Sequence, residues 1–179
     1  GREIPMSPRQ RDALLREGLW GLNDTITDNK NAGIWRYYDA DEQANDLDHV
    51  HFQGVLSTDD TFASFADYAR GSGAGDGRDT QIGSIGGGNH FVELQTVEEV
   101  WGGAAHAWGL TTDAVTIMAH SGSVGLGHAV GGFFGDQARE IFPKQLRRPD
   151  HGFFVVPTQG PHAALAARYL GAMRNAANF

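Results

Sequence analysis

Apolar side chains recur at helical spacing in three parts of the chain. Ser7-Pro8 has the form of an N-cap followed by proline at the first helical position, which predicts a helix over residues 9–17 that ends at Gly18. The residues expected on its buried side are Leu14, Leu15, Leu19 and Trp20. Residues 58–69 predict a second helix, and residues 165–177 predict an alanine-rich third. The inner side of this third helix is expected to carry Leu165, Tyr169, Leu170 and Met173.

Shorter apolar stretches predict strands. Residues 91–94 alternate between the two faces that a strand presents. Residues 114–118 (AVTIM) and 153–156 (FFVV) are apolar, which predicts two buried strands. The first of these leads into a glycine-rich turn and then a helix over residues 126–141. The chain is therefore expected to be mixed α/β (α+β), with short buried strands leading into glycine-rich turns and helices.

Length and glycine content bear on domain organisation. At 179 residues the chain predicts a single domain, residues 1–179, with its own core. The 25 glycines are about twice the usual share, and they cluster. The cluster GSGAGDG at residues 71–77 predicts a flexible glycine-rich connector over residues 70–79 rather than a domain boundary. The other clusters fit either close approach of the backbone to a ligand or flexible surface loops.

Composition narrows the classes of function. The net charge of −8 argues against bulk electrostatic binding of nucleic acid, so such a role would need a local basic patch or metal ions. The absence of cysteine excludes disulfides and thiolate zinc sites built from this chain. The chain has no run of about 18 apolar residues and no signal segment, so we expect a cytoplasmic protein without membrane contact.

The strongest candidate for chemistry is QIGSIGGGNHFVE, residues 81–93. Three successive glycines allow the backbone to approach a ligand closely, and the strand that follows fixes the side chains. Period-two geometry puts His90 on the face opposite Asn89 and Glu93. His90 could then reach manganese, zinc or iron while Asn89 and Glu93 bind a polar ligand. A tight turn with a core histidine is the alternative.

A second candidate is VTIMAHSGSVGLGH, residues 115–128. His120 ends a predicted strand, where α/β proteins place ligands. The helix that opens after it has free N–H groups and a dipole that favour an anion such as phosphate, and Ser121 and Ser123 add hydroxyl donors. No lysine follows the glycines, so this is not a Walker A loop. A packed strand-to-helix turn explains the pattern equally well.

The remaining histidines and the basic residues are weaker candidates. His128 lies inside a predicted helix and fits packing or support of the site better than metal binding. DLDHVH, residues 46–51, looks like a metal cluster but fits a solvated surface better. KQLRR, residues 144–148, is the basic patch of the sequence, and either contact with RNA phosphates or a solvated helix end explains it.

GGGNHFVE at residues 86–93, followed by HSGSVGLGH at residues 120–128, resembles the RtcB family of RNA-splicing ligases. The tail at residues 157–179 is similar to the same family, so the resemblance covers most of residues 80–179. It implies an RtcB-like fold, of which this chain is the central part of the catalytic domain.

The resemblance implies a GTP- and manganese-dependent RNA ligase of tRNA splicing and RNA repair. Such an enzyme joins an RNA 2′,3′-cyclic phosphate or 3′-phosphate end to a 5′-hydroxyl end, so RNA and GTP are the implied partners. A histidine of the family takes GMP from GTP and passes it to the RNA 3′-phosphate, while a pair of manganese ions neutralises charge on the phosphates. Metal would also reconcile RNA binding with an acidic chain.

The resemblance also assigns residues. His90 and His120 match metal-binding histidines on the two different ions of the pair. The stretch that contacts the guanylate matches Asn89, His90, Phe91, Val92 and Glu93.

Other parts of the family pattern have no match in this chain. The family's bridging cysteine and its aspartate partner precede the matched segment, and its third metal histidine and GMP-carrying histidine follow Phe179, so no catalytic residue is assigned here. Val124 stands where the family usually has arginine, which removes a bidentate phosphate donor. We expect a fragment of a longer ligase, inactive alone, or a divergent relative. A non-catalytic nucleotide- or RNA-binding protein and another metal-dependent phosphoesterase are the alternatives.

Overall fold

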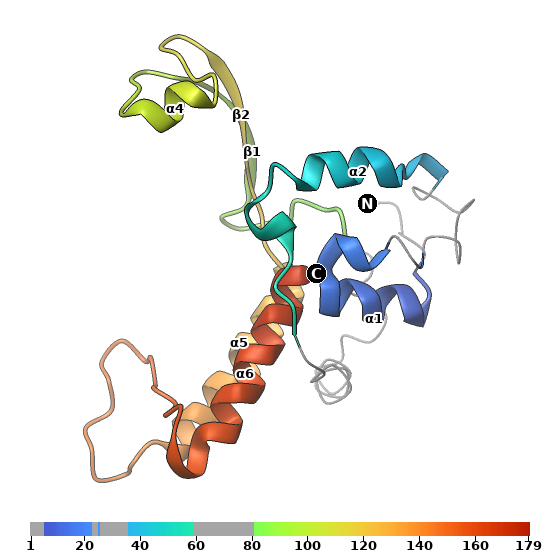
Figure 1. The fold of residues 1–179 in the computed structure, drawn as a ribbon. Coiled ribbons are helices and arrows are strands. Elements are labelled where there is room, and N and C mark those ends of the chain that lie inside the picture. The colour runs from blue at the N-terminus through green and yellow to red at the C-terminus, as the bar shows by residue number, and fades with distance from the viewer. Residues whose placement is uncertain (1–5, 23–24, 26–35, 59–80) are drawn as a thin grey trace.

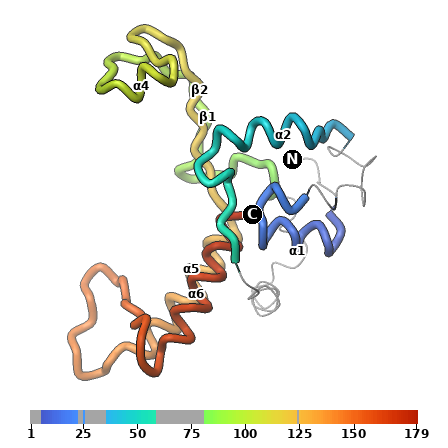
Figure 2. Tube along the Cα trace, viewed as in Figure 1, coloured from blue at the N-terminus to red at the C-terminus, as the bar shows by residue number. Residues whose placement is uncertain are grey.

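The structure is a computed structural model that describes residues 6–22, 25, 36–58 and 81–179. The predicted mixed α/β class is confirmed, because helices combine with a two-stranded sheet. Figure 1 shows the sheet projecting away from the helices, and Figure 2 shows the same course of the chain. Within the described residues, no helix combines the length and the apolar character needed to span a bilayer.

Helix α1 (Pro8–Glu17) begins and ends where the sequence predicts. The Ser7 hydroxyl accepts from the Gln10 amide at 3.1 Å, and the Gln10 side chain accepts from the Ser7 amide at 2.8 Å, which forms a capping box. Gly18, with φ of 62°, ends the helix and opens the 3-10 turn η1 (Gly18–Leu22). Leu14 and Leu15 are buried as predicted, whereas Leu19 is 45% exposed, so its predicted inward position is wrong.

Helix α2 (Ala40–Leu47) is formed by an acidic segment of the chain. The Asp39 carboxylate caps it by accepting from the amides of Asp41 and Glu42 at 2.9 and 3.0 Å. The 3-10 turn η4 (His51–Gly54) follows. The predicted helix over residues 58–69 lies outside the described residues apart from its first residue, and the predicted connector over residues 70–79 lies wholly outside them.

Strands β1 (Phe91–Thr96) and β2 (Val115–His120) form an antiparallel hairpin with Phe91 opposite His120 and Thr96 opposite Val115. The short helix α4 (Gly103–Ala107) lies in the connection at the far end (Figure 1). The predicted burial of the second strand is wrong, because Val115 and Ile117 are both 72% exposed. A strand over residues 153–156 is also wrong, since this segment is not a strand and Phe153 is 77% exposed. No other described element covers Val115, Ile117 or Phe153.

The main core lies between α5 (Val124–Ile141) and α6 (Ala163–Asn178), which follows the 3-10 turn η6 (Gly160–His162). Side chains at four-residue spacing on α5 face alanines on α6, where small side chains let the two helices approach closely. The buried cluster consists of Leu15, Leu126, Val130, Phe134, Ala172 and Ala176. Leu165 and Tyr169 pack against it as predicted, whereas Leu170 and Met173 are exposed, contrary to prediction.

The end of α6 is joined to the end of α1 by two buried asparagines. Asn175 Nδ2 donates to the Leu15 carbonyl at 2.7 Å, and Asn178 Nδ2 donates to the same oxygen at 3.0 Å. The last carbonyls of a helix have no partner within it, so these amides satisfy a group that α1 leaves open. Asn178 also bonds the backbone of Leu56 in both directions, at 2.9 and 3.0 Å.

Candidate functional site

The two predicted motifs meet at the base of the hairpin. The ring centres of His90 and His120 lie 5.7 Å apart, with an angle of 65° between the ring planes. The ring of Phe91 lies 5.5 Å from that of His120. His90 is half-buried and His120 is exposed. The structure therefore brings together two histidines separated by 29 intervening positions along the chain.

The register of the hairpin explains this approach. His90 immediately precedes the first residue of β1, and His120 is the last residue of β2. In an antiparallel pair the start of one strand lies beside the end of the other, and Phe91 pairs directly with His120. A shift by one residue would move every side chain of a strand to the other face, so this register fixes the proximity of the two imidazoles.

Two side-chain hydrogen bonds fasten the glycine-rich turns to each other. The Ser121 hydroxyl donates to the Ile85 carbonyl at 2.9 Å, and the Gln81 side-chain oxygen accepts from the Gly125 amide at 3.1 Å. The N-cap Ser123 makes no capping bond with its side chain, so Gln81 satisfies an open amide at the start of α5 instead. The Gly125 amide and the Ser121 proton are therefore already used within the protein, which weakens the predicted anion site at this helix start.

The immediate surroundings of His90 fit a ligand-binding imidazole. A Cβ at Gly122 would lie 3.5 Å from His90 Nε2, so the glycine leaves that nitrogen without a neighbouring side chain. His90 Nδ1 is buried, and no described residue forms a hydrogen bond with it. A buried nitrogen without a partner carries a cost of about 1–3 kcal/mol, which a bound ion or a further polar group would remove.

The donor set is suited to a transition metal but incomplete. Imidazole nitrogens bind zinc, iron and related ions, and both histidines present them at one place. Across the described ranges no group of three or more His, Cys, Asp and Glu side chains could hold a metal ion. Ions bound by His90 and by His120 would thus take their other ligands from water, from substrate or from residues outside the described ranges.

The predicted guanylate stretch lies directly beside the histidines. Asn89, Val92 and Glu93 are exposed, and Phe91 is half-buried. Glu93 Oε2 accepts from Gln95 Nε2 at 3.1 Å. The exposed amide of Asn89 and the exposed carboxylate of Glu93 therefore lie close to the two histidines. Their binding of a guanylate stays a prediction.

The weaker candidates do not join this site. His128 is exposed on α5, so a packing role for it is wrong. In the acidic segment His49 Nδ1 lies 3.0 Å from the Asn45 carbonyl oxygen. This segment provides no group of three or more described His, Cys, Asp or Glu side chains that could hold a metal ion. Val124 begins α5 directly after the histidine turn.

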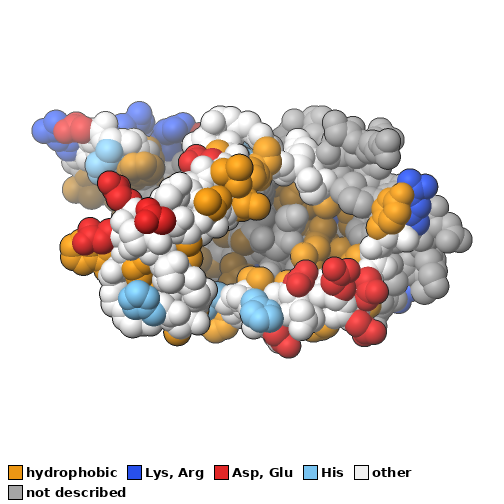
Figure 3. All heavy atoms as spheres, turned by 90° about the horizontal axis from the view of Figure 1, so that it is seen from above, with side chains coloured by type: hydrophobic (Ala, Val, Ile, Leu, Met, Phe, Trp, Pro, Cys, Tyr) orange, Lys and Arg blue, Asp and Glu red, His pale blue; other side chains and the backbone are white. Residues whose placement is uncertain are grey.

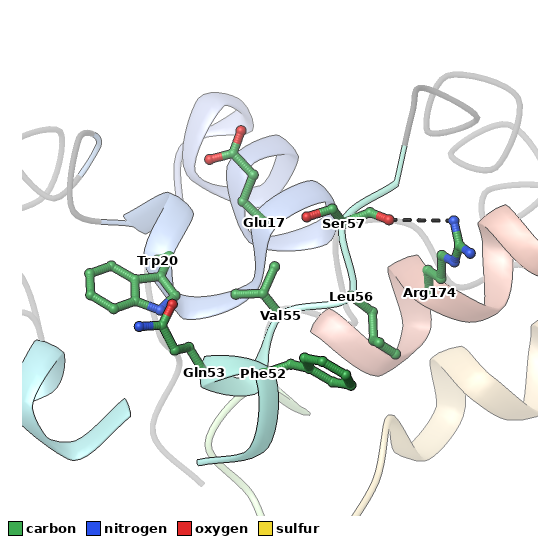
Figure 4. Close-up of a pocket in the computed structure, with 8 residues that line it drawn as sticks. All are labelled: Glu17, Trp20, Phe52, Gln53, Val55, Leu56, Ser57 and Arg174. Carbon is green, nitrogen blue, oxygen red and sulfur yellow. Dashed lines mark hydrogen bonds between the residues drawn. The ribbon is translucent and has the colours of Figure 1, made fainter. Parts of the chain in front are cut away.

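A separate cavity lies between α1, η4 and α6, and no pattern in the sequence predicted it. Its volume is about 750 Å³, and Figure 4 shows Arg174 donating toward the Ser57 carbonyl at its edge, a distance of 3.5 Å. The lining residues are Glu17, Trp20, Phe52, Gln53, Val55, Leu56, Ser57 and Arg174. They come from three distant parts of the chain, so no local motif could predict the cavity. It shares no residue with the histidine turns.

Comparison with known proteins places these motifs in a family. The family model described as tRNA-splicing ligase RtcB matches residues 2–179. An RNA-splicing ligase RtcB of Mycobacterium bovis is 34% identical over 171 residues, which cover 83% of this chain and 37% of that protein. A tRNA-splicing ligase RtcB of Thermococcus kodakarensis is 34% identical over 164 residues, covering 88% of this chain and 31% of that protein.

A shorter and more similar match is found in a tRNA-splicing ligase RtcB of Pyrococcus horikoshii. It is 40% identical over 101 residues, which cover 55% of this chain and 11% of that protein. The chain thus spans between 11% and 37% of the length of these relatives. Since the family model extends over nearly all of the sequence, the chain belongs to the RtcB family.

Proposed function

We propose that this chain is part of an RNA ligase that joins a 2′,3′-cyclic phosphate or 3′-phosphate RNA end to a 5′-hydroxyl end. The ligase uses GTP and Mn²⁺ and serves tRNA splicing and RNA repair in the cytoplasm. The observation that carries the proposal is the convergence of His90 and His120 at 5.7 Å between ring centres. Family membership and the names of the relatives support RNA ligation.

In this proposal each imidazole holds one ion of a manganese pair. Metal ions about 3.5–4 Å apart form the clamp used in many phosphoryl-transfer sites, and the separation of the two rings is compatible with neighbouring ions. The ions supply positive charge to the RNA and GTP phosphates. Gly122 keeps the space beside His90 open, while the Ser121 and Gln81 hydrogen bonds hold the two turns in position.

Asn89 and Glu93 are proposed to bind the guanine. Its exocyclic amino group is a donor, which a carboxylate accepts, and an amide both donates and accepts. Both side chains are exposed next to His90, so one strand would present the guanylate and the metal to each other. Phe91 packs against His120 and orients its ring. Residues outside this chain complete the ligand set and carry the GMP, so the chain alone is expected to be inactive.

Titration with Mn²⁺ tests the metal site in the chain itself. Binding is compared for the parent, His90→Ala, His120→Ala and the matched control His128→Ala, whose ring is exposed on α5. Each of the first two substitutions removes a ligand and is expected to weaken Mn²⁺ binding by about tenfold or more, since even losses in the outer shell cost that much. The control should bind as the parent does. Equal binding by all four proteins would refute the site.

The reaction is tested with the full-length protein that contains this chain. RNA with a cyclic-phosphate end is incubated with RNA bearing a 5′-hydroxyl, GTP and Mn²⁺. A joined product is expected, and its loss in His90→Ala and His120→Ala ties the reaction to this site. Hydrolysis of the cyclic phosphate without joining would indicate a phosphoesterase. Binding of nucleotide with neither reaction would indicate a non-catalytic relative.

A further inference from the structure

A basic surface lies at the end of α5 opposite the histidines. We define it as Arg139 on the last turn of the helix together with Lys144, Arg147 and Arg148 in the connection to α6. Arg139, Lys144 and Arg148 line a hollow of about 390 Å³, whose lining also includes the carboxylate of Glu140. Figure 3 shows one group of Lys and Arg side chains at the upper left of the face in view and another at its right edge. This concentration is notable in a chain whose net charge is −8.

Two of these cations have no ionic partner among the described residues. Arg139 pairs with Asp136 at 2.8 Å, and Arg147 pairs with Asp150 at 2.9 Å. Lys144 and Arg148 make no ion pair with any residue in the described part of the chain, and both are exposed. Two unpaired cations at one hollow create a local positive potential that an anionic ligand would neutralise.

Aromatic side chains accompany these charges. Phe142 and Phe154 meet edge to face at 5.3 Å, and the Arg139 guanidinium lies 5.7 Å from the centre of the Phe154 ring. Phe153 stays 77% exposed beside this pair. Of these rings, Phe142 lines the hollow and is half-buried, and Phe153 is exposed nearby. Cations combined with aromatic rings are the arrangement with which proteins bind single-stranded nucleic acid, since phosphates contact the cations and bases stack on the rings.

Helix α5 sets the distance between the basic surface and the histidines. Its 18 residues give a length of about 27 Å at the usual helical rise. A stacked nucleic-acid strand advances about 3.4 Å per nucleotide, so about eight nucleotides separate the two ends of α5. A strand with its terminal phosphate at the histidines would therefore reach the basic surface.

We propose that the basic surface binds the backbone of single-stranded RNA about eight nucleotides from the end held at the histidines. This inference rests on the ligase function proposed above and extends it to how the RNA strand is bound. A protein partner fits less well, because lysine is depleted in the cores of protein interfaces and Lys144 and Arg148 would have to be desolvated there.

The test measures RNA binding without metal. Affinity for a single-stranded RNA of about 16 nucleotides, roughly twice the estimated span, is measured in EDTA over a series of salt concentrations. Parent chain is compared with the double variant Lys144→Gln/Arg148→Gln. A matched control, Arg36→Gln/Arg174→Gln, removes the same charge from exposed positions elsewhere. Circular dichroism checks that the variants fold alike.

Loss of two phosphate contacts should lower the slope of log affinity against log salt by about 1.4, at about 0.7 per contact for a single strand. The control should keep the slope of the parent. Identical slopes for the two double variants, or a parent that binds no RNA, would overturn the inference. If the full-length protein joins RNA but Lys144→Gln/Arg148→Gln keeps the parent's salt slope, only this inference is refuted. If the double variant has the lower slope but the full-length protein joins no RNA, only the proposed reaction is refuted.

Discussion

The most informative substitution in the scaffold is Asn175→Asp, because it changes one donor into an acceptor without changing shape. Asn175 is fully buried at 0% exposure, and its Nδ2 donates to the Leu15 carbonyl at 2.7 Å. Within the described part of the chain its Oδ1 has no hydrogen-bond partner. One oxygen of a carboxylate at this position would face the Leu15 carbonyl oxygen, and no donor would face the other oxygen. A buried charge without compensation costs several kcal/mol, so the introduced carboxyl should have a raised pKa and take up a proton.

The sign of the pH dependence follows from this raised pKa. An unfolded aspartate titrates near pH 3.9, whereas the folded variant would hold its proton to higher pH. The native state then binds more protons than the unfolded state, so stability falls as pH rises through this window. The loss is at most about 1.4 kcal/mol per pH unit, or about 2.7 kcal/mol from about pH 4.5 to about pH 6.5. Below the unfolded pKa the penalty disappears, since the protonated acid can donate to Leu15 as the amide does.

The assay is urea unfolding followed by circular dichroism at several pH values. Asn175→Ala is the control, because it removes the same hydrogen bond without introducing a charge. It should be destabilised by about 1 kcal/mol at every pH, as Asn178 continues to donate to the Leu15 carbonyl. The aspartate variant should resemble the parent in acid and fall below the alanine variant toward neutral pH. Parallel stability curves for the two variants would refute the reasoning.

Two further predictions concern packing and the histidine turn. Gly21→Ala would place a Cβ 2.5 Å from the Ala13 carbonyl oxygen, so we expect the free energy of unfolding in urea to fall by about 1–3 kcal/mol. The control is Gly131→Ala, whose Cβ would meet no neighbouring atom within 4 Å, and it should be neutral or stabilising. Equal effects of the two substitutions would contradict the clash. Gln81→Ala removes the side chain that accepts from the Gly125 amide. We expect the free energy of unfolding to fall by about 1 kcal/mol and Mn²⁺ binding to weaken in the titration described above. Unchanged stability and unchanged Mn²⁺ binding would show that this hydrogen bond does not position the turn.

Local signals in the sequence predicted those parts of the fold that depend on local interactions. The serine-proline start and glycine end of α1 are contacts between near neighbours, so both boundaries were predictable. The long helices α5 and α6 were predicted to within two residues at each end. The approach of His90 to His120 was also predicted, through the resemblance of their two motifs to one family.

Burial could not be predicted from the same patterns. An apolar run shows that a segment can be buried, whereas burial itself depends on whether another element covers it. Val115 and Ile117 lie on a sheet of two strands, and the described residues provide no layer above them. The asparagine pair at the end of α6 was missed for a related reason. Its partner carbonyl at Leu15 lies 160 residues away from Asn175, beyond the range of any helical periodicity.

The two histidines and the segment that connects the strands lie at opposite ends of the hairpin. The histidines lie at the root, whereas the segment from residue 97 to residue 114 turns at the opposite end, about 20 Å away along six-residue strands. Strand pairing between these ends, and not the length of the turn, sets the alignment of the two imidazoles. The turn is thus a place where residues can be added or grafted, such as a fluorescent tag, while the spacing of the rings is preserved.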